Sequence, residues 1–152
     1  TGRTFEENAV LKAVTISRTL SGRVAADDSG LEVDALGGAP GIFSARYSGE
    51  NATDQENICK LLQKLGDTRD RRARFRCVIA LAGAGKTLAA FSGELEGTIS
   101  IKPRGENGLG YDPIFIPAVF DRSLAELGEE AKNRISHRGQ ALAALRAALE
   151  LP

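Results

Sequence analysis

The 152-residue chain is predicted to fold as a single α/β domain over residues 1–152, with a mixed β-sheet and flanking helices. Helix-capping patterns and strand-like runs alternate along the whole chain, and no linker, internal repeat or low-complexity tract separates them. The composition, 42% hydrophobic and 26% charged residues, is that of a globular protein. A chain of roughly 150 residues buries enough surface to need no disulfide bond.

The first predicted elements are a helix and an interrupted strand. Residues 4–7 (TFEE) have the spacing of a capping box, and the apolar residues after them repeat with a helical period, which predicts a helix over residues 5–20. Residues 23–27 (RVAAD) indicate a short buried strand. Ser29–Gly30 interrupts this strand, and residues 31–35 resume the alternation that is typical of a strand.

A glycine-rich loop, a second helix and a group of strands follow. The loop covers residues 37–41 (GGAPG), and a second capping box (TDQE) begins a helix over residues 53–65. Residues 74–82 and 87–101 are predicted to form two or three antiparallel strands, the first pair joined by a turn at residues 83–85.

The last elements complete the order α-β-β-α-β-β-β-β-α-α. Residues 113–117 (PIFIP) indicate a strand bounded by prolines. Ser123 and Glu126 form a third capping box over a short helix, and Ser136 caps the final helix. That helix carries an apolar face made of Leu142, Leu145, Ala148 and Leu149.

Charge and cysteine content exclude several classes of protein. Twenty basic residues balance twenty acidic ones, whereas a nucleic-acid-binding protein normally has a basic excess. No apolar run is long enough for a membrane span, and no signal-peptide pattern is present, so we expect a cytoplasmic protein without a membrane partner. Cys59 and Cys77 lack the spacing of zinc ligands and are expected to be buried free thiols.

The first cluster of polar residues, Asp27 and Asp28, lies at the end of a predicted buried strand. Unpaired carboxylates are costly to bury, so the pair indicates a bound cation such as Mg²⁺, which uses one or two carboxylates together with substrate phosphates. Neighbouring side chains of a strand point to opposite faces, so one of the two is expected to face the site. The alternative is an aspartate that caps the Ser29–Gly30 turn.

The second cluster is Gly108–Pro113 (GLGYDP), where two glycines allow a close approach to the backbone. Tyr111 and Asp112 then offer an aromatic ring and a hydrogen-bond acceptor, or else Tyr111 belongs to the core beside a tight turn. In the third cluster, Lys132, His137 and Arg138 gather near the start of the last helix. Helix N-termini favour anions, so cations there indicate a bound anion or electron-rich group, or else a solvated basic turn.

Two other motifs do not predict a site. Residues 83–87 (GAGKT) resemble the end of a P-loop, but Ala80 occupies the position of the first glycine, and a strand rather than a helix follows. No Gly-x-Ser-x-Gly motif of a hydrolase nucleophile elbow is present.

Five motifs occur in one order along the chain: Thr1–Ala13 (TGRTFEENAVLKA), Ala26–Leu31 (ADDSGL), Gly37–Tyr47 (GGAPGIFSARY), Gly110–Phe115 (GYDPIF) and Lys132–Gly139 (KNRISHRG). With them the chain resembles the inosine triphosphatase family, the house-cleaning XTP/dITP pyrophosphatases. The resemblance implies an elongated α/β fold with two lobes around an active-site cleft, and a homodimer. It also implies Mg²⁺-dependent hydrolysis of purine nucleoside triphosphates, namely ITP, dITP and XTP, to the monophosphate and pyrophosphate.

The resemblance also implies roles for individual residues. Asp28 matches the metal-linked general base, Ser29 a substrate contact and Lys12 a phosphate-binding lysine. The base-pocket loop is matched by Leu109, Gly110, Tyr111 and Asp112, and the residues that hold the base and reach its oxo group by Lys132, His137 and Arg138. Donors facing a 6-oxo group would accept hypoxanthine and xanthine but would be left unpaired by the amino group of adenine.

The sequence departs from the family pattern in two places. Leu109 stands where relatives usually have a phenylalanine that stacks on the base, so we expect weaker base binding or stacking by Tyr111. The family also usually has a strand, a triphosphate-binding loop and an acidic metal ligand before the Thr1–Gly2 pair, and this chain, which has no Met, is expected to lack them. An inactive nucleotide-binding remnant, or a related pyrophosphatase for modified pyrimidine nucleotides, therefore remains an alternative.

Overall fold

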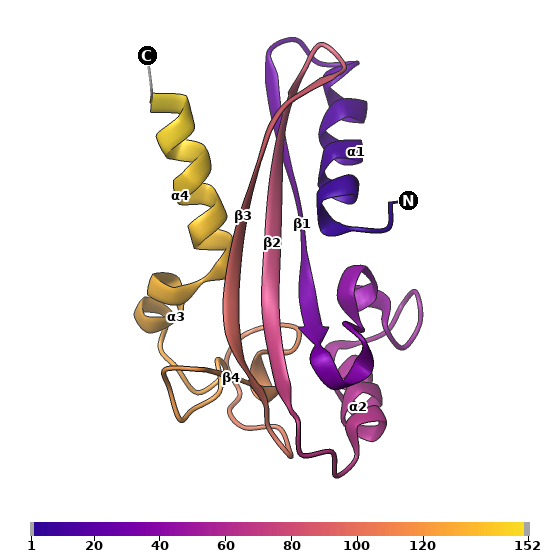
Figure 1. Ribbon diagram of the computed structural model, residues 1–152, viewed down its shortest axis with the longest axis vertical. Coiled ribbons are helices and arrows are strands. Elements are labelled where there is room, and N and C mark those ends of the chain that lie inside the picture. The colour runs from indigo at the N-terminus through magenta and orange to yellow at the C-terminus, as the bar shows by residue number, and fades with distance from the viewer. Residues whose placement is uncertain (1, 151–152) are drawn as a thin grey trace. The chain divides into compact units, whose positions relative to one another are not determined.

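A computed structural model describes residues 2–150 of the chain, so the predictions that concern Thr1 and the last two residues lie outside the described part. The α/β class is confirmed: helices flank a four-stranded sheet of order β1-β2-β3-β4 (Figure 1). The strands are β1 (Arg23–Val33), β2 (Arg72–Gly83), β3 (Lys86–Ile99) and β4 (Phe115–Pro117). The α-helices are α1 (Phe5–Ser17), α2 (Asp54–Leu65), α3 (Glu129–Ile135) and α4 (His137–Glu150).

The sheet is antiparallel where a mixed sheet was predicted. β1 and β2 run in opposite directions, and β2 turns directly into β3 (Figure 1). β3 pairs antiparallel with β4, with Thr98 opposite Ile116. β2 and β3 must be antiparallel because the tight turn at residues 83–86 joins them directly.

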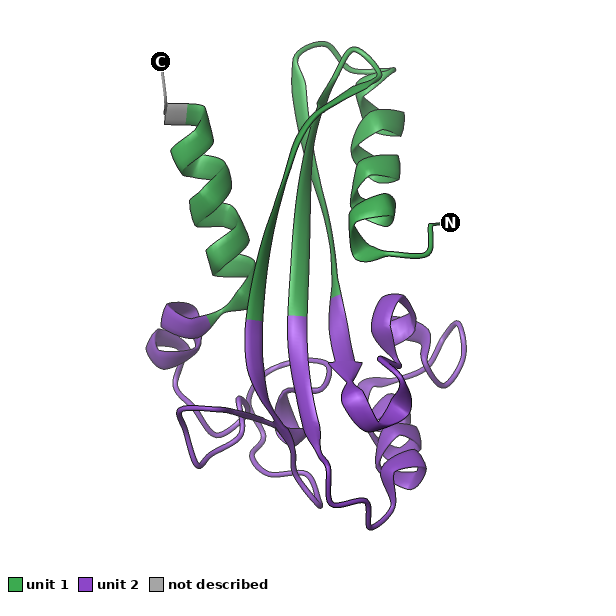
Figure 2. Cartoon of the chain, viewed as in Figure 1, with its two compact units in different colours: residues 1–29, 76–94, 136–152 green, residues 30–75, 95–135 purple. Residues whose placement is uncertain are grey.

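Two compact units divide the chain. Unit 1 consists of residues 1–29, 76–94 and 136–152, and unit 2 of residues 30–75 and 95–135 (Figure 2). The long strands β1, β2 and β3 contribute residues to both units, so the predicted single domain contains two clusters of contacts.

Unit 1 packs α1 and α4 on opposite faces of its strands. Along β2, Val78 lies with Glu6 of α1 in one pocket, whereas Ile79 lies with Leu142 of α4 in another. Neighbouring residues of a strand point to opposite faces, so each helix covers its own face. Ala9 of α1 is fully buried, as is Ala13 one turn later, and these small side chains allow the helix backbone to lie close to the sheet.

Unit 2 contains the larger apolar core. Phe115 of β4 is fully buried, and its ring centroid lies 4.6 Å from that of Phe75 on β2. Leu61 and Leu65 of α2 join this core.

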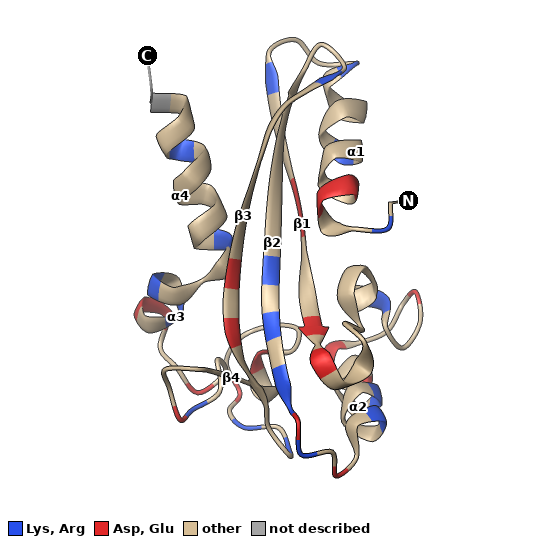
Figure 3. Ribbon diagram, in the orientation of Figure 1, with Lys and Arg blue, Asp and Glu red and all other residues tan. Residues whose placement is uncertain are grey.

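Charged residues are concentrated in the part of the sheet in unit 2, where Arg72 and Arg74 of β2 lie between acidic residues of the neighbouring strands (Figure 3). Arg74 donates to Asp34 and to Glu96, each at 2.9 Å. The partly buried Arg74 guanidinium is therefore paired with a carboxylate on each side.

Several local predictions are confirmed. Thr53 and Glu56 form a complete capping box at the start of α2, and Thr4 caps α1 by accepting from the amide of Glu7 at 3.0 Å. Residues 83–86 form the β2–β3 turn, in which Ala84 and Gly85 have positive φ, so this segment is a hairpin and not a P-loop. Ser136 accepts from the amide of Gly139 at 3.1 Å in the first turn of α4.

Other local predictions are wrong. β1 runs without a break through Ser29–Gly30, because its pairing with β2 outweighs the weak strand preference of glycine. One half of the predicted Ser123–Glu126 box forms, because the amide of Ser123 donates to Glu126 Oε1 at 2.8 Å. Residues 124–126 nevertheless form a turn instead of a helix, and α3 begins only at Glu129. Cys77 is buried as predicted, but Cys59 is exposed because α2 directs its neighbour Ile58 into the core.

Within residues 2–150, no helix is both long enough and apolar enough to cross a membrane.

Candidate active site

A first cluster of candidate residues lies within unit 1, where Asp28 of β1 meets α1. Lys12 donates from Nζ to Asp28 Oδ1 at 3.2 Å and to the carbonyl oxygen of Asp27 at 3.0 Å. Asn8, one helical turn before Lys12, donates from Nδ2 to Asp28 Oδ2 at 3.3 Å. The Asp28 side chain is 17% exposed and that of Lys12 is 53% exposed. A carboxylate of low exposure thus lies beside an amine that remains accessible to solvent.

Asp27 points to the opposite face of β1, as the pleat of a strand requires. There its Oδ2 accepts from Arg138 Nη2 of α4 at 3.0 Å, and the same nitrogen lies 3.3 Å from the hydroxyl oxygen of Ser29. The prediction that only one of the two aspartates faces a given site is therefore correct. Ser29 and Arg138 are brought together, but on the face opposite to Asp28 and Lys12.

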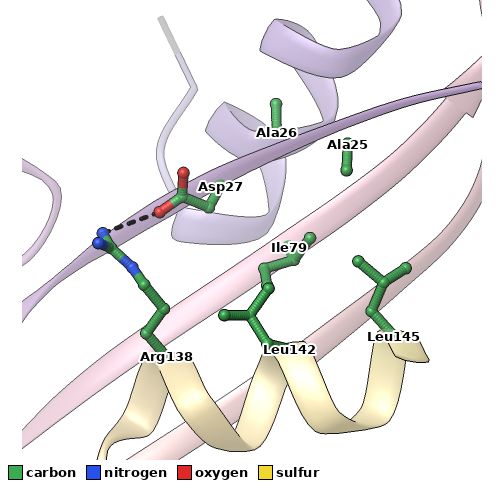
Figure 4. A pocket seen from close by; sticks show the side chains of 7 residues that line it. All are labelled: Ala25, Ala26, Asp27, Ile79, Arg138, Leu142 and Leu145. Atoms are coloured by element: carbon green, nitrogen blue, oxygen red, sulfur yellow. Dashed lines mark hydrogen bonds and ion pairs between the residues drawn. The ribbon is translucent and has the colours of Figure 1, made fainter. Parts of the chain in front are cut away.

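The Asp27–Arg138 pair lines a pocket of about 200 Å³ between β1, β2 and α4 (Figure 4). Ile79, Leu142 and Leu145 supply its apolar wall. Both charged side chains are about half exposed, at 44% for Asp27 and 57% for Arg138. The guanidinium therefore keeps donors accessible to solvent or to a ligand.

His137 begins α4 next to Arg138. Burial lowers the pKa of His137 to about 4, and the neighbouring positive charge of Arg138 acts in the same direction, so the imidazole is neutral at pH 7. Gly93 of β3 allows this turn to lie close, since a Cβ atom there would overlap the carbonyl oxygen of His137. Gln140 fixes the turn further by donating to the carbonyl of Glu94 at 2.8 Å and accepting from its amide at 3.2 Å.

A second cluster of candidate residues, within unit 2, is the Leu109–Asp112 loop. The amide of Gly110 donates to Asp54 Oδ2 at 2.9 Å, and the amide of Leu109 donates to Asp112 Oδ2 at 3.2 Å. Gly110 has a φ of 59°, a left-handed conformation that glycine adopts without strain. The Leu109 side chain is 82% exposed.

Tyr111 belongs to the core of unit 2. It is 5% exposed, and its hydroxyl donates to the carbonyl of Ser44 at 2.7 Å. Burial raises the pKa of Tyr111, and the charges of Tyr47 and Asp54 raise it further. The ring is packed inside the unit, so the expectation that Tyr111 stacks on a base in place of Leu109 finds no support in this geometry.

Of the residues predicted to gather near the start of the last helix, Lys132 belongs to unit 2, whereas His137 and Arg138 belong to unit 1. Lys132 lies on α3 in unit 2 and donates to Asp112 Oδ2 at 3.0 Å, with both side chains less than a fifth exposed. Arg138 is paired with Asp27 in unit 1. The chain itself therefore supplies an anion to each of these cations, and the charge argument alone does not require an external one.

Sequence reasoning missed Asn8 and Asp54, which hold Asp28 and Gly110 respectively. Asn8 had a readable signal, because it precedes Lys12 by four residues and so shares its face of α1. Asp54 had none, since its partner lies 56 residues away in the chain.

The carboxylate that a divalent cation could bind in the unit 1 cluster is that of Asp28. Among residues 2–150, no group of three or more His, Cys, Asp or Glu side chains is arranged to hold a metal ion. Mg²⁺ is commonly bound by one or two carboxylates and completed by substrate phosphates. Asp28, with its partly buried carboxylate, fits the role of one such ligand.

Comparison with known proteins gives consistent matches. Residues 1–148 match the Ham1 family. The chain is 53% identical over 150 residues to a dITP/XTP pyrophosphatase of Staphylococcus aureus, and this match covers 99% of this chain and 77% of the relative. It is 51% identical over 152 residues to a dITP/XTP pyrophosphatase of Bacillus licheniformis, with 99% of this chain and 78% of the relative covered.

Two solved structures of related proteins also resemble this chain in fold. The structure of the Staphylococcus aureus Ham1 protein superimposes with a TM-score of 0.95 at 53% identity, covering 99% of this chain and 78% of that one. A HAM1 protein from Coxiella burnetii gives a TM-score of 0.93 at 49% identity, covering 98% of this chain and 78% of that one.

Proposed function

Because the chain belongs to the Ham1 family, we propose that it is a nucleoside-triphosphate pyrophosphatase that hydrolyses deaminated purine nucleotides such as dITP, XTP and ITP. The products are the nucleoside monophosphate and pyrophosphate, so the reaction removes these nucleotides from the cellular pool. The names of the Staphylococcus aureus and Bacillus licheniformis relatives support this substrate class.

The observation that carries the proposal is the Asp28–Lys12 pair. A carboxylate 17% exposed is held at 3.2 Å from a lysine that remains half exposed. Phosphoryl transfer depends mainly on positioning and on neutralising negative charge. This pair supplies both a group that can take a proton and a cation for the phosphate chain.

In the proposed reaction, Asp28 accepts a proton from a water molecule as the water oxygen attacks the α-phosphorus. The bond between the α-phosphorus and the bridging oxygen breaks, and pyrophosphate leaves with the bonding electrons. Lys12 stabilises the charge that develops on the phosphate oxygens. Mg²⁺, bound by Asp28 and the substrate phosphates, would supply further charge neutralisation.

We assign recognition of the base to Leu109–Asp112, Lys132, His137 and Arg138. Arg138 uses one nitrogen on Asp27 and Ser29, which leaves other N–H donors for the 6-oxo group of hypoxanthine or xanthine. A neutral His137 can contribute one N–H donor. Adenine presents an amino group at this position, so the donors would go unpaired and ATP would be a poor substrate.

We further propose that the protein is a homodimer, because the family resemblance implies one. We also propose that it acts in the cytoplasm, where its nucleotide substrates would be found.

A substrate panel tests the proposal. Pyrophosphate release is measured with ITP, dITP, XTP, ATP, GTP, UTP and dTTP, with Mg²⁺ and with EDTA. The expected result is Mg²⁺-dependent turnover of ITP, dITP and XTP, with ATP, UTP and dTTP as much poorer substrates; GTP, whose base also has a 6-oxo group, measures the effect of its 2-amino group. Equal turnover of UTP or dTTP would favour pyrimidine substrates, and binding of ITP without turnover would favour an inactive nucleotide-binding protein.

Asp28→Asn gives the matched variant, because it removes the charge and almost no volume. We expect loss of Mg²⁺-dependent turnover with an unchanged circular dichroism spectrum and melting temperature within a few degrees. Lys86→Gln, a change in the exposed β2–β3 turn, serves as the control for removal of a charge in the same unit. Retained activity of Asp28→Asn would refute the role assigned to Asp28.

A further inference from the structure

We propose that Asp54 is a positioning residue for the purine base, acting through the Leu109–Asp112 loop. The inference rests on the proposed function, since it takes this loop as part of the base site. Asp54 is the first residue of α2, and its carboxylate accepts from the amide of Gly110 at 2.9 Å.

The start of α2 does not need Asp54 as its cap. Thr53 accepts from the amide of Glu56 at 3.1 Å, and Glu56 accepts from the amide of Thr53 at 2.9 Å. This complete capping box satisfies the helix end locally. The Asp54 carboxylate is thus available for a contact with the loop.

Carboxylates occupy both amides at the tip of the loop. Asp112 accepts from Leu109, and Asp54 accepts from Gly110, which adopts a left-handed φ of 59°. Both amides are therefore already hydrogen-bonded, and the part of the loop that a ligand can contact is the exposed side chain of Leu109. Fixing the amides determines where Leu109 points.

Loss of the Asp54 carboxylate would free the Gly110 amide and let the loop populate other conformations. Apparent affinity for a base falls by the fraction of molecules that keep the competent conformation. The residues assigned to phosphate, Lys12 and Asp28, belong to unit 1, whereas Asp54 and the loop belong to unit 2. The effect should therefore depend on the presence of a base.

The test compares Asp54→Ala, Asp54→Asn and Glu56→Ala with the wild-type protein. Glu56→Ala is the matched control, because it also removes an acidic residue from the first turn of α2 but has no bond to the loop. Asp54→Asn keeps an oxygen that can accept from Gly110. Titration calorimetry measures the Kd of IMP, which carries the base, and of inorganic tripolyphosphate, which does not, and kinetics with ITP give kcat and KM.

For Asp54→Ala we expect the Kd of IMP and the KM of ITP to rise by up to roughly fivefold, the limit reached when loss of one ordinary hydrogen bond makes the competent loop conformation a minor state. The Kd of tripolyphosphate and kcat should stay unchanged. Asp54→Asn should recover most of the affinity for IMP. Glu56→Ala, which loses one bond of the capping box, should be less stable but should bind IMP as the wild type does.

The inference is overturned if Asp54→Ala binds IMP like the wild type, if it weakens tripolyphosphate equally, or if Glu56→Ala has the same effect. It is also overturned if the wild type does not bind IMP. A wild type that binds IMP but releases no pyrophosphate from ITP would refute the proposed reaction alone, and the binding comparison would still decide the role of Asp54.

Discussion

Breaking the Lys132–Asp112 pair should measurably destabilise the protein. Lys132 Nζ lies 3.0 Å from Asp112 Oδ2, and the two side chains are 18% and 17% exposed. The same carboxylate oxygen accepts from the amide of Leu109 at 3.2 Å. Replacing Lys132 by Met keeps most of the side-chain volume and leaves a partly buried carboxylate with this neutral donor.

The size of the effect follows from the exposure of the pair. Exposed ion pairs contribute up to about 1 kcal/mol, whereas removing one partner of a buried pair costs about 3–5 kcal/mol. A pair less than one fifth exposed lies between these limits, so Lys132→Met should lower the free energy of unfolding by about 2 kcal/mol. For a chain of this size, that corresponds to a fall in Tm of about 4–8 °C.

A double-mutant cycle with Asp112→Asn isolates the interaction. Urea unfolding is measured for the wild type, Lys132→Met, Asp112→Asn and the double variant, and a coupling free energy of about 1 kcal/mol or more is expected. Additive single effects, with a coupling free energy near zero, would refute the reasoning. They would mean that the two side chains do not stabilise each other in the folded protein.

Three further predictions concern stability, all measured by urea unfolding. Thr53→Ala removes the cap of α2 and should cost about 1 kcal/mol, and an unchanged midpoint would contradict the role of the capping box. Phe115→Ala empties a fully buried site against Phe75 and should cost about 4 kcal/mol, so a loss below about 1 kcal/mol would show that the core collapses to fill the space. Burial lowers the pKa of His137 from 6.5 to about 4, so the unfolded chain binds a proton between these pH values that the folded chain does not. Stability should therefore fall as the pH drops from 6.5 to 4, and His137→Gln should weaken this dependence; equal slopes for variant and wild type would argue against a neutral, buried imidazole.

The sequence by itself determined the elements whose signals are local. The Thr53–Glu56 capping box forms as predicted, because all its donors and acceptors lie within four residues. The turn at residues 83–86 also forms as predicted, because its glycines allow the backbone to reverse. The two polar clusters around Asp28 and Asp112 were recognisable as well, because helix and strand patterns did not account for them.

Only the tertiary structure decided which of these residues meet. The pleat of β1 and the packing of helices on both faces of the sheet separate Asp28, beside Lys12, from Asp27, beside Arg138. Lys132 appears in the sequence beside His137 yet pairs with Asp112 twenty residues before it, and Asp54 reaches Gly110 across 56 residues. Such contacts depend on strand register and on the packing of distant segments, which neither composition nor periodicity encodes.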